Sequence, residues 1–230
     1  MVCYNMLQVM RYHYRNGVKQ KVGGATALWV LFPVIGLFAG GYILVTSLSP
    51  AVDVMGPAPE ATAKKLQAEQ PILSENRIYV PKVNIDVAIV DVSGDEKLAL
   101  EKGAIHRAAG NGNPKDGGNY VVAGHRFQLG WNPSLTRKKS PFYHIDRLSK
   151  GDQIYVDYNG TRYAYEISEK RKVPQNAIEI EKRTDEPQLT MYSCDLRGPE
   201  AGREVVIAKP IGTIAWVDGQ PKLKTSIDSL

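Results

Sequence analysis

Cysteine is nearly absent from this 230-residue sequence, which contains only Cys3 and Cys194. A long uncharged apolar segment separates the two, so a membrane crossing there would place them on opposite sides of the bilayer and prevent a disulfide. The sequence also lacks the CxxC and CxxH spacings that commonly hold zinc. We therefore expect Cys194 to be a free thiol, and we expect no metal ion and no organic cofactor.

Clusters of charge of one sign are also rare beyond the N-terminus. The chain has 29 Lys and Arg residues and 24 Asp and Glu residues, a formal net charge of +5, and most basic residues alternate with acidic ones. This distribution is typical of a solvated mixed surface and does not predict a nucleic-acid partner. A hydrophobic fraction of 43% and a charged fraction of 23% indicate a globular protein, and the length allows one ordinary domain plus appendages.

The N-terminal region departs from this even distribution. Residues 1–21 contain basic but no acidic residues, and residues 25–48 carry no charge over a length that exceeds the roughly 20 residues a spanning helix needs. The positive flank predicts a single-pass anchor at residues 25–48 in the cell membrane, with residues 1–24 cytoplasmic and the rest of the chain extracytoplasmic. A cleaved signal peptide is the alternative, because Ser47 and Ser49 form a small-x-small pair, but its apolar core would be shorter, about 7 to 15 residues.

The composition changes again after the apolar segment. Residues 49–76 are rich in Pro, Ala, Glu and Lys and lack a β pattern, so we expect a stalk with a helix near Ala61 to Glu69. Residues 77–217 contain the β-prone runs of the main domain. Residues 218–230 are polar, and we expect a loose tail there.

Short β-prone runs separated by turn signals fill the main domain. Runs on both sides of Pro81 predict either an edge strand or a broken pair of strands. Asp95 is a suitable cap for a short helix that Gly103 ends. Asn159-Gly160 is a strong hairpin signal, because both positions of that turn need positive φ. Many short strands with few helical patterns predict an all-β domain that is closed or nearly closed.

The strand after Asn159-Gly160 shows an alternating pattern. Tyr163, Tyr165 and Ile167 alternate with more polar or smaller residues, among them Arg162 and Glu166. This period of two predicts a strand with one buried face.

Three residues at predicted strand ends carry the strongest chemical signal. An apolar run brings Cys194 to the end of one strand, and Arg203 opens the next strand after a loop that contains Gly and Pro. Residues 120–123 predict a buried strand, and His125 lies just past its end. A thiolate nucleophile, an imidazole that moves protons and a cation that stabilises an oxyanion are the groups that thiol acyl transfer requires.

Each of these residues has a structural alternative or a competitor. A buried cysteine is most often a small hydrophobe, and a histidine at a strand end can be a hydrogen-bonded core residue. His106 and His144 compete with His125 as the proton carrier. Arg197 competes with Arg203, but it lies within the loop, whereas Arg203 begins a strand that can return beside the cysteine.

The order of these motifs carries a family resemblance. Gly-His-Arg occupies residues 124–126, Thr-x-x-x-Cys ends at Cys194, and Arg203 follows nine residues later. The runs GAIHRAAGNGNPKDGGNYVV and PFYHIDRLSKGDQIYV flank the histidine motif. In this order the motifs resemble the sortases, a family of Gram-positive surface transpeptidases, over residues 77 to about 211. The chain departs from the family pattern at Ser193, where many sortases have Thr, and in FQLGWNPSLTRKKS after the histidine, which is longer and more basic than usual.

The resemblance implies a fold and a reaction. The fold would be the eight-stranded sortase β-barrel with short helices, preceded by one transmembrane helix, with the catalytic domain at residues 77–217. Cys194 would attack the Thr-Gly carbonyl of an LPXTG-type sorting peptide and form a thioester, His125 would transfer protons, and Arg203 would hold the oxyanion. The acyl group would pass to an amine of a cell-wall precursor or to a pilin lysine. The alternatives are a cysteine peptidase, a peptidoglycan L,D-transpeptidase, and a membrane-tethered barrel that binds peptides or wall polymers without catalysis.

Overall fold

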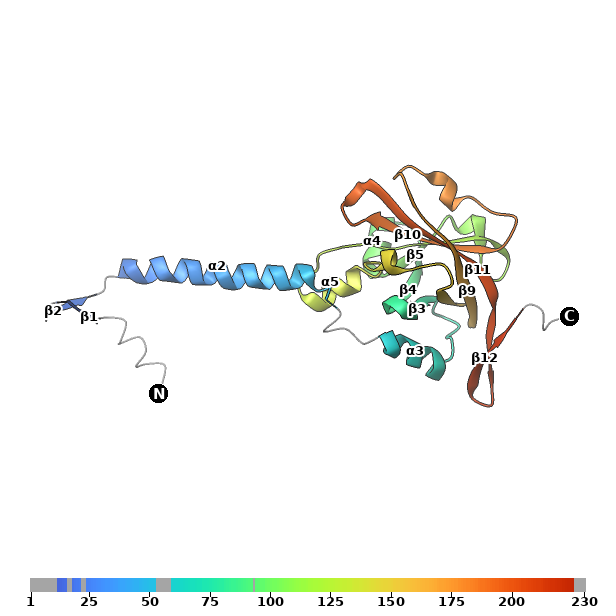
Figure 1. Cartoon of the computed structure of the whole chain (residues 1–230), viewed down its shortest axis with the longest axis horizontal. Helices are drawn as coiled ribbons and strands as arrows, with labels where there is room; N and C mark the ends of the chain where they lie inside the picture. The colour runs from blue at the N-terminus through green and yellow to red at the C-terminus, as the bar shows by residue number, and fades with distance from the viewer. Residues whose placement is uncertain (1–11, 16–17, 22–23, 53–58, 93, 226–230) are drawn as a thin grey trace. The chain divides into compact units, whose positions relative to one another are not determined.

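The chain folds into two compact units, and the structure, a computed structural model, describes residues 12–15, 18–21, 24–52, 59–92 and 94–225 of it. The first unit ends at Val45 and contains a hairpin of β1 (Tyr12–Arg15) and β2 (Val18–Lys21), followed by most of the helix α2 (Gly24–Leu48) (Figure 1). The second unit begins at Thr46 and holds the rest of the described chain.

The helix α2 is apolar around its whole circumference. All residues from Leu31 to Val45 are exposed, and an exposed helix that is hydrophobic on every side needs a nonaqueous environment. Among the described residues, α2 is the one helix that is long and apolar enough to cross a membrane, with its candidate span at Leu31–Leu48. Pro33 lies inside the helix, which membrane-spanning helices tolerate.

A closed eight-stranded β-barrel forms the second unit, as predicted. The strands follow the order β10-β11-β9-β8-β3-β4-β5-β7, and parallel pairing of β7 with β10 closes the barrel. The short strands β6 and β12 pair with β7 and β11 at its margins. The bounds are β3 (Arg77–Val80), β4 (Ile85–Asp91), β5 (Ala104–Arg107), β6 (Gly112–Asn113), β7 (Gly117–Ala123), β8 (Gln153–Tyr158), β9 (Thr161–Val173), β10 (Gln188–Asp195), β11 (Gly198–Val217) and β12 (Gln220–Lys224).

Two hydrophobic clusters stabilise the barrel. The larger cluster draws side chains from all eight barrel strands and fills the interior, with Met191 of β10 and Val206 of β11 among its fully buried members. The smaller cluster lies on the other face of the strands around Tyr192 of β10, where Ala99 and Ile180 from flanking helices cover it. Because successive side chains of a strand alternate in direction, Cys194 shares the face of Tyr192 and points away from the barrel interior.

The local turn and cap signals produced the expected elements. The Asp95 side chain accepts hydrogen bonds from the backbone N–H groups of Lys97 and Leu98 at the start of α4 (Glu96–Lys102). A 3₁₀ turn, η2 (Pro81–Val83), separates β3 from β4, so the run around Pro81 is a broken antiparallel pair. Asn159 and Gly160 have φ of 47° and 75° and connect β8 to β9.

Two further segments contain regular structure. The polar segment after His125 contains the helix α5 (Pro133–Lys139), which Asn132 caps by accepting a hydrogen bond from Leu135 N at 2.8 Å. The prediction of a loose tail is wrong for residues 218–224, because Asp218 and Gly219 adopt φ of 53° and 74° and fold β12 back onto β11. An Asp-Gly pair of this kind is itself a hairpin signal.

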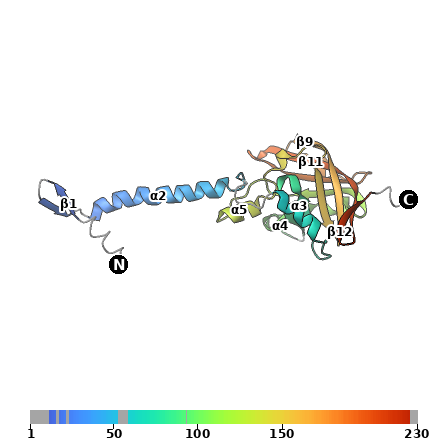
Figure 2. The same ribbon diagram turned by 60° about the horizontal axis from the view of Figure 1, so that its bottom comes forward.

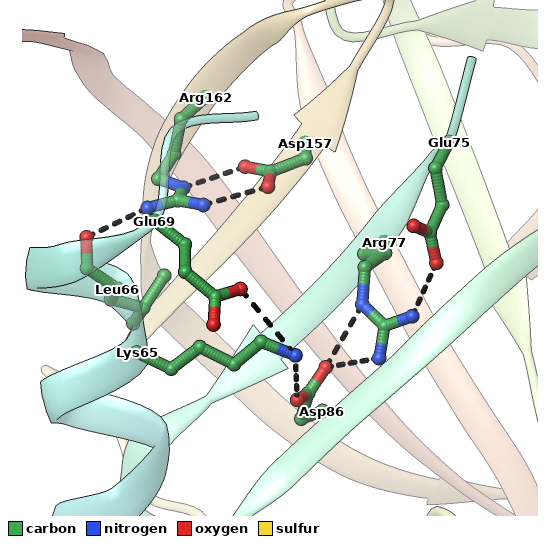
Figure 3. Close-up of polar contacts among 8 residues, drawn as sticks. All are labelled: Lys65, Leu66, Glu69, Glu75, Arg77, Asp86, Asp157 and Arg162. Carbon is green, nitrogen blue, oxygen red and sulfur yellow. Dashed lines mark hydrogen bonds and ion pairs between the residues drawn. The ribbon is translucent and has the colours of Figure 1, made fainter. Parts of the chain in front are cut away.

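The helix α3 (Pro59–Ala68) docks on the barrel, so the residues expected to form a stalk contribute to the folded domain. It packs against η2 and β12 and lies across the strands (Figure 2). Lys65 Nζ lies 2.7 Å from Asp86 Oδ2 of β4, and Arg77 of β3 contacts the same carboxylate (Figure 3). Burial alone would raise the pKa of Asp86, but these two cations outweigh burial and hold its pKa below the ordinary value.

Arg162 is buried although it lies on the face of β9 opposite the predicted buried one. Its side chain is 1% exposed, and its guanidinium pairs with both oxygens of Asp157, at 2.6 and 2.7 Å. It also donates to the Leu66 carbonyl of α3 at 2.7 Å (Figure 3) and lies 5.2 Å from the ring centroids of Tyr79 and Trp216. The outer face of the strand is therefore covered by distant segments, which a local alternation pattern cannot reveal.

Candidate active site

Cys194 lies near the end of β10, opposite Arg203 of β11. The two residues are antiparallel partners, and the ladder shifts register between Cys194 and Asp195, immediately before the connecting loop. The thiol is free and half-buried. The apolar strand therefore brings the sulfur to the rim of the barrel, where a substrate can reach it.

Arg203 directs its guanidinium to the thiol. Its Nη1 lies 3.7 Å from Cys194 Sγ, and its Nε donates to the Gln175 carbonyl at 3.2 Å. The guanidinium also lies 5.4 Å from the ring centroid of Tyr192, on the same face of β10 as Cys194. These contacts place a fixed cation beside the nucleophile that the sequence predicted.

His125 lies at the end of the neighbouring parallel strand. Ala123 of β7 is the register partner of Tyr192, and Gly124 N continues the pairing by donating to Tyr192 O at 3.2 Å. His125 and Cys194 lie two residues beyond these partners on their strands. Because parallel strands end at the same edge of a sheet, the structure brings the predicted imidazole and thiol to one end of the barrel.

The surroundings of His125 favour its neutral form. The residue is half-buried, and this burial lowers the pKa of the imidazole below its ordinary value. Glu101 of α4 raises the pKa and Lys139 of α5 lowers it. These two residues pair with each other at 3.2 Å, so their opposing effects on His125 come from one ion pair.

Arg197, the competitor of Arg203, is occupied within the loop. Its backbone N–H and its Nε donate to Asp195 Oδ1 at 2.9 and 3.0 Å, and its side chain is 74% exposed. Lys172 of β9 lies 3.2 Å from the other oxygen of Asp195. The hydrogen bonds from Arg197 and the contact with Lys172 hold the pKa of Asp195 well below its usual range. Arg197 and Asp195 therefore fix the loop that follows the cysteine.

A polar network behind Arg203 was not found from the sequence. The Tyr192 hydroxyl donates to Glu181, and Arg107 Nε lies 2.9 Å from the same carboxylate. Burial and the bond to Glu181 raise the pKa of Tyr192 well above its ordinary value, so the phenol stays neutral. The position of Tyr192 on the cysteine's face was visible in the sequence, but Glu181 comes from a distant 3₁₀ turn, η5 (Ile178–Glu181), and no local signal links the two.

A polar cavity of about 580 Å³ opens beside the end of β10. Arg126, which is 6% exposed, lies in its lining and donates to Asp146 at 2.6 Å. Lys172 and the nearly buried Glu204 line the same cavity and pair at 2.7 Å. The barrel thus presents both a cation and a carboxylate next to the loop after the cysteine.

The two competing histidines lie outside this group. His106 is 6% exposed, packs 4.6 Å from the Tyr120 ring centroid, and has its Nε2 3.2 Å from the Gly112 carbonyl. His144 packs edge-on against Tyr143 and lines a different cavity, of about 670 Å³, with residues of α3 and β4. In the part of the chain that the structure describes, no group of three or more His, Cys, Asp or Glu side chains could hold a metal ion.

Sequence comparisons relate this chain to a known protein family. A family model described as a sortase domain matches residues 78–211. Sortase A of Bacillus anthracis is 25% identical over 139 residues, which cover 60% of this chain and 60% of that protein. Sortase A of Listeria monocytogenes is 25% identical over 118 residues, covering 51% of this chain and 48% of that protein. The matched regions therefore span about half to three fifths of the relatives' length.

Solved structures share the barrel. The Listeria monocytogenes sortase A structure superposes with a TM-score of 0.51 at 21% identity, covering 65% of this chain and 90% of that chain. The Streptococcus pneumoniae sortase C structure gives a TM-score of 0.50 at 21% identity, covering 60% and 66%. These similarities support the eight-stranded fold that the strand pairing shows.

Proposed function

The chain belongs to the sortase family, and from that premise we propose that it is a cysteine transpeptidase that joins surface proteins to an amine. The observation that carries the proposal is the meeting of three groups at one end of the barrel. Arg203 Nη1 lies 3.7 Å from Cys194 Sγ, and the parallel pairing of β7 with β10 brings His125 to the same edge. These groups are sufficient for acyl transfer without a cofactor.

In the first half-reaction, the Cys194 thiolate attacks the carbonyl carbon of a Thr-Gly bond in an LPXTG-type sorting peptide. The tetrahedral oxyanion forms near Arg203, whose fixed guanidinium stabilises the developing charge. The carbon–nitrogen bond then breaks, and the imidazolium of His125 donates its proton to the departing amine. The product is a thioester on Cys194 and a released peptide with a free amino group.

In the second half-reaction, an acceptor amine attacks the thioester carbonyl. The now neutral His125 removes a proton from this amine as the new amide bond forms. The carbon–sulfur bond breaks, and Cys194 leaves as a thiolate. The acceptor is a primary amine of a cell-wall precursor or of another surface protein, such as a pilin lysine.

We assign the domains accordingly. Residues 25–48 form an uncleaved single-pass anchor in the cell membrane, residues 1–24 are cytoplasmic, and the catalytic domain of residues 77–217 is extracytoplasmic. The exposed apolar helix α2 and the basic residues before it support this orientation. Residues 49–76 connect the anchor to the barrel, in part through the docked helix α3, and residues 218–230 follow the catalytic domain.

Product analysis tests this function. The full chain in detergent micelles would be incubated with an LPXTG-type peptide and triglycine, and the products would be identified by mass. We expect a peptide cut after Thr and joined to triglycine, and no such product from Cys194→Ala. A product that carries water in place of triglycine at every amine concentration would indicate a cysteine peptidase instead, and no turnover would favour a binding module.

A further inference from the structure

The segment between His125 and the next barrel element forms a loop whose two ends lie close together. We call residues 127–140 the basic loop. Phe142 N donates to the His125 carbonyl at 3.2 Å, so the loop leaves and re-enters the fold at nearly the same point. This is the segment that is longer and more basic than the family pattern, and the proposed transpeptidation uses only Lys139 of it, through its effect on the pKa of His125.

The tip of the basic loop exposes large apolar side chains on a fixed base. Trp131 is 88% exposed and Leu129 is 50% exposed, and Phe127 at the start of the loop is 39% exposed. Gly130 N donates to Thr136 Oγ1 at 3.0 Å, and Thr136 is fully buried. The base therefore holds the tip in place, and exposed apolar side chains gathered in one loop commonly mark a site of interaction.

The charge of the basic loop has one sign. Residues 127–145 contain no acidic residue, and α5 ends with Arg137, Lys138 and Lys139. Lys138 is exposed, whereas Lys139 pairs with Glu101. An exposed Trp and Leu next to basic side chains match the composition that binds the interface of an anionic membrane.

Hydrogen bonding ties the basic loop to the end of the apolar helix. Ser49 Oγ lies 2.8 Å from the Thr46 carbonyl and 3.0 Å from the Pro133 carbonyl, so its one proton is shared between α2 and the loop. Ser49 directly follows the candidate span that ends at Leu48. Thr46 and later residues belong to the same compact unit as the barrel, and Ser49 is buried within it. Because the apolar run ends there, Pro133 lies at the depth of the bilayer surface if α2 spans the membrane.

We propose that the basic loop docks on the outer surface of the membrane that α2 spans. Trp131 and Leu129 enter the interfacial layer, where Trp is enriched in membrane proteins, and Arg137 and Lys138 face anionic lipid headgroups. The inference rests on the proposed membrane anchor. The docking would also position the active site. His125 precedes Trp131 by only six residues, so docking of the loop holds His125 close to the membrane surface.

Fluorescence quenching in nanodiscs tests the docking. The full chain would be placed in nanodiscs of phosphatidylcholine and phosphatidylglycerol, with or without bromine on the acyl chains near the headgroup. Subtracting the emission of Trp131→Phe isolates Trp131, and subtracting that of Trp29→Phe isolates a residue of the anchor. We expect bromine to quench both components. Trp131→Phe combined with Ile178→Trp moves the reporter to a position that is 74% exposed in the native structure, and its emission should be insensitive to bromine.

The outcomes separate the two proposals. Quenching of Trp29 without quenching of Trp131 would overturn the docking and leave the anchor intact. Absence of quenching at both positions would overturn the anchor and the docking together, whether or not the chain is an active transpeptidase. Arg137→Gln with Lys138→Gln should weaken the quenching of Trp131, whereas Lys222→Gln with Lys224→Gln, which removes two exposed charges from β12, should not. Equal effects of the two pairs would contradict the proposed role of the loop charges.

Discussion

Single side chains determine whether the thiol of this site can react. Arg203 is held by a backbone carbonyl and by the face of Tyr192 while its Nη1 approaches Cys194. A planar guanidinium fixed in this way can donate to an oxyanion at the moment it forms, which a flexible ammonium does less well. The identity and the orientation of this cation should therefore both matter to the rate.

Replacing the cation tests its role. We expect Arg203→Ala to lower the turnover number by roughly 10²- to 10³-fold, the usual loss for one oxyanion-stabilising donor. Arg203→Lys should recover only a small part of the rate. Arg197→Ala is the matched control, and it should cost far less because Arg197 turns to Asp195. Steady-state transpeptidation rates of the three variants would decide, and a larger loss for Arg197→Ala would reverse the assignment.

The pH dependence of the rate should reflect the burial of His125. The active form combines a Cys194 thiolate with a His125 imidazolium. Adding a proton to this pair or removing one inactivates it, so kcat/KM should be bell-shaped in pH. Because burial lowers the pKa of His125, the acid limb should lie below the value of about 6.5 for an ordinary imidazole. Glu101→Gln removes a charge that raises this pKa and should move the acid limb to lower pH. Lys139→Gln should move it to higher pH, and shifts in the same direction would refute this electrostatic account.

Strand pairing explains how residues 69 positions apart in the sequence meet at one edge. The parallel pairing of β7 with β10 aligns the ends of both strands. Gly124, which connects β7 to His125, allows close packing at this end of the barrel. A Cβ built on Gly124 would lie 2.8 Å from the side chain of the fully buried Phe142. The glycine is therefore required by packing against a rigid ring.

Gly124→Ala should consequently displace His125, the next residue in the chain. We expect a loss of about 1–3 kcal/mol in unfolding free energy, as for overpacked cores, and a larger fractional loss of turnover. Phe142→Leu in the same chain should relieve the contact and restore part of both. Denaturant unfolding in micelles and transpeptidation rates would measure the two effects. Full activity of Gly124→Ala alone would show that the packing is not needed.

The docking of α3 should stabilise the barrel through Arg162. Breaking a buried ion pair by removing one partner typically costs about 3–5 kcal/mol, and the Arg162 and Asp157 side chains are 1% and 3% exposed. In denaturant titrations we expect Asp157→Asn to lower the unfolding free energy of the domain by about 3–5 kcal/mol. Glu186→Gln breaks the exposed pair with Lys209 and should change stability by about 0–1 kcal/mol. Similar losses in both variants would argue against a special role for the buried pair.

Sequence reasoning was accurate where the signal was local. Asp95 and Asn159-Gly160 specify a cap and a turn through their own backbone, and both formed as predicted. It did not foresee the burial of Arg162, because the cover over that residue comes from α3, whose Leu66 lies 96 residues earlier. The bond between Tyr192 and Glu181 was missed for the same reason. Contacts of this kind depend on tertiary packing, which alternation and turn patterns do not encode.

The chain as a whole combines an apolar helix with a sortase-family domain that begins close to it in the sequence. Ten residues separate Leu48 from Pro59, where the docked helix α3 begins. Under the proposed anchoring, the contact of the basic loop with Ser49 and the docking of α3 on the barrel would leave only a short free segment between the membrane and the barrel. Tethering of this kind would raise the effective concentration of any substrate bound to the same membrane.

The proposed topology predicts different labelling of the two cysteines. In intact cells that express the chain, a membrane-impermeant maleimide should label Cys194 and should label Cys3 only after permeabilisation. Cys194→Ala and Cys3→Ala variants identify each band. Labelling of Cys3 in intact cells would contradict the orientation, and loss of the N-terminal segment from the intact mass would show a cleaved signal peptide.

The covalent intermediate is the most direct test of the account. The full chain in micelles would be mixed with an LPXTG-type peptide without an acceptor amine, quenched in acid within seconds, and measured by intact mass and peptide mapping. The account predicts an acyl adduct on Cys194 that disappears when triglycine is added before the quench, and no adduct on Cys194→Ala. An adduct elsewhere, or transpeptidation that persists in Cys194→Ala, would contradict the central claim that this thiol is the nucleophile.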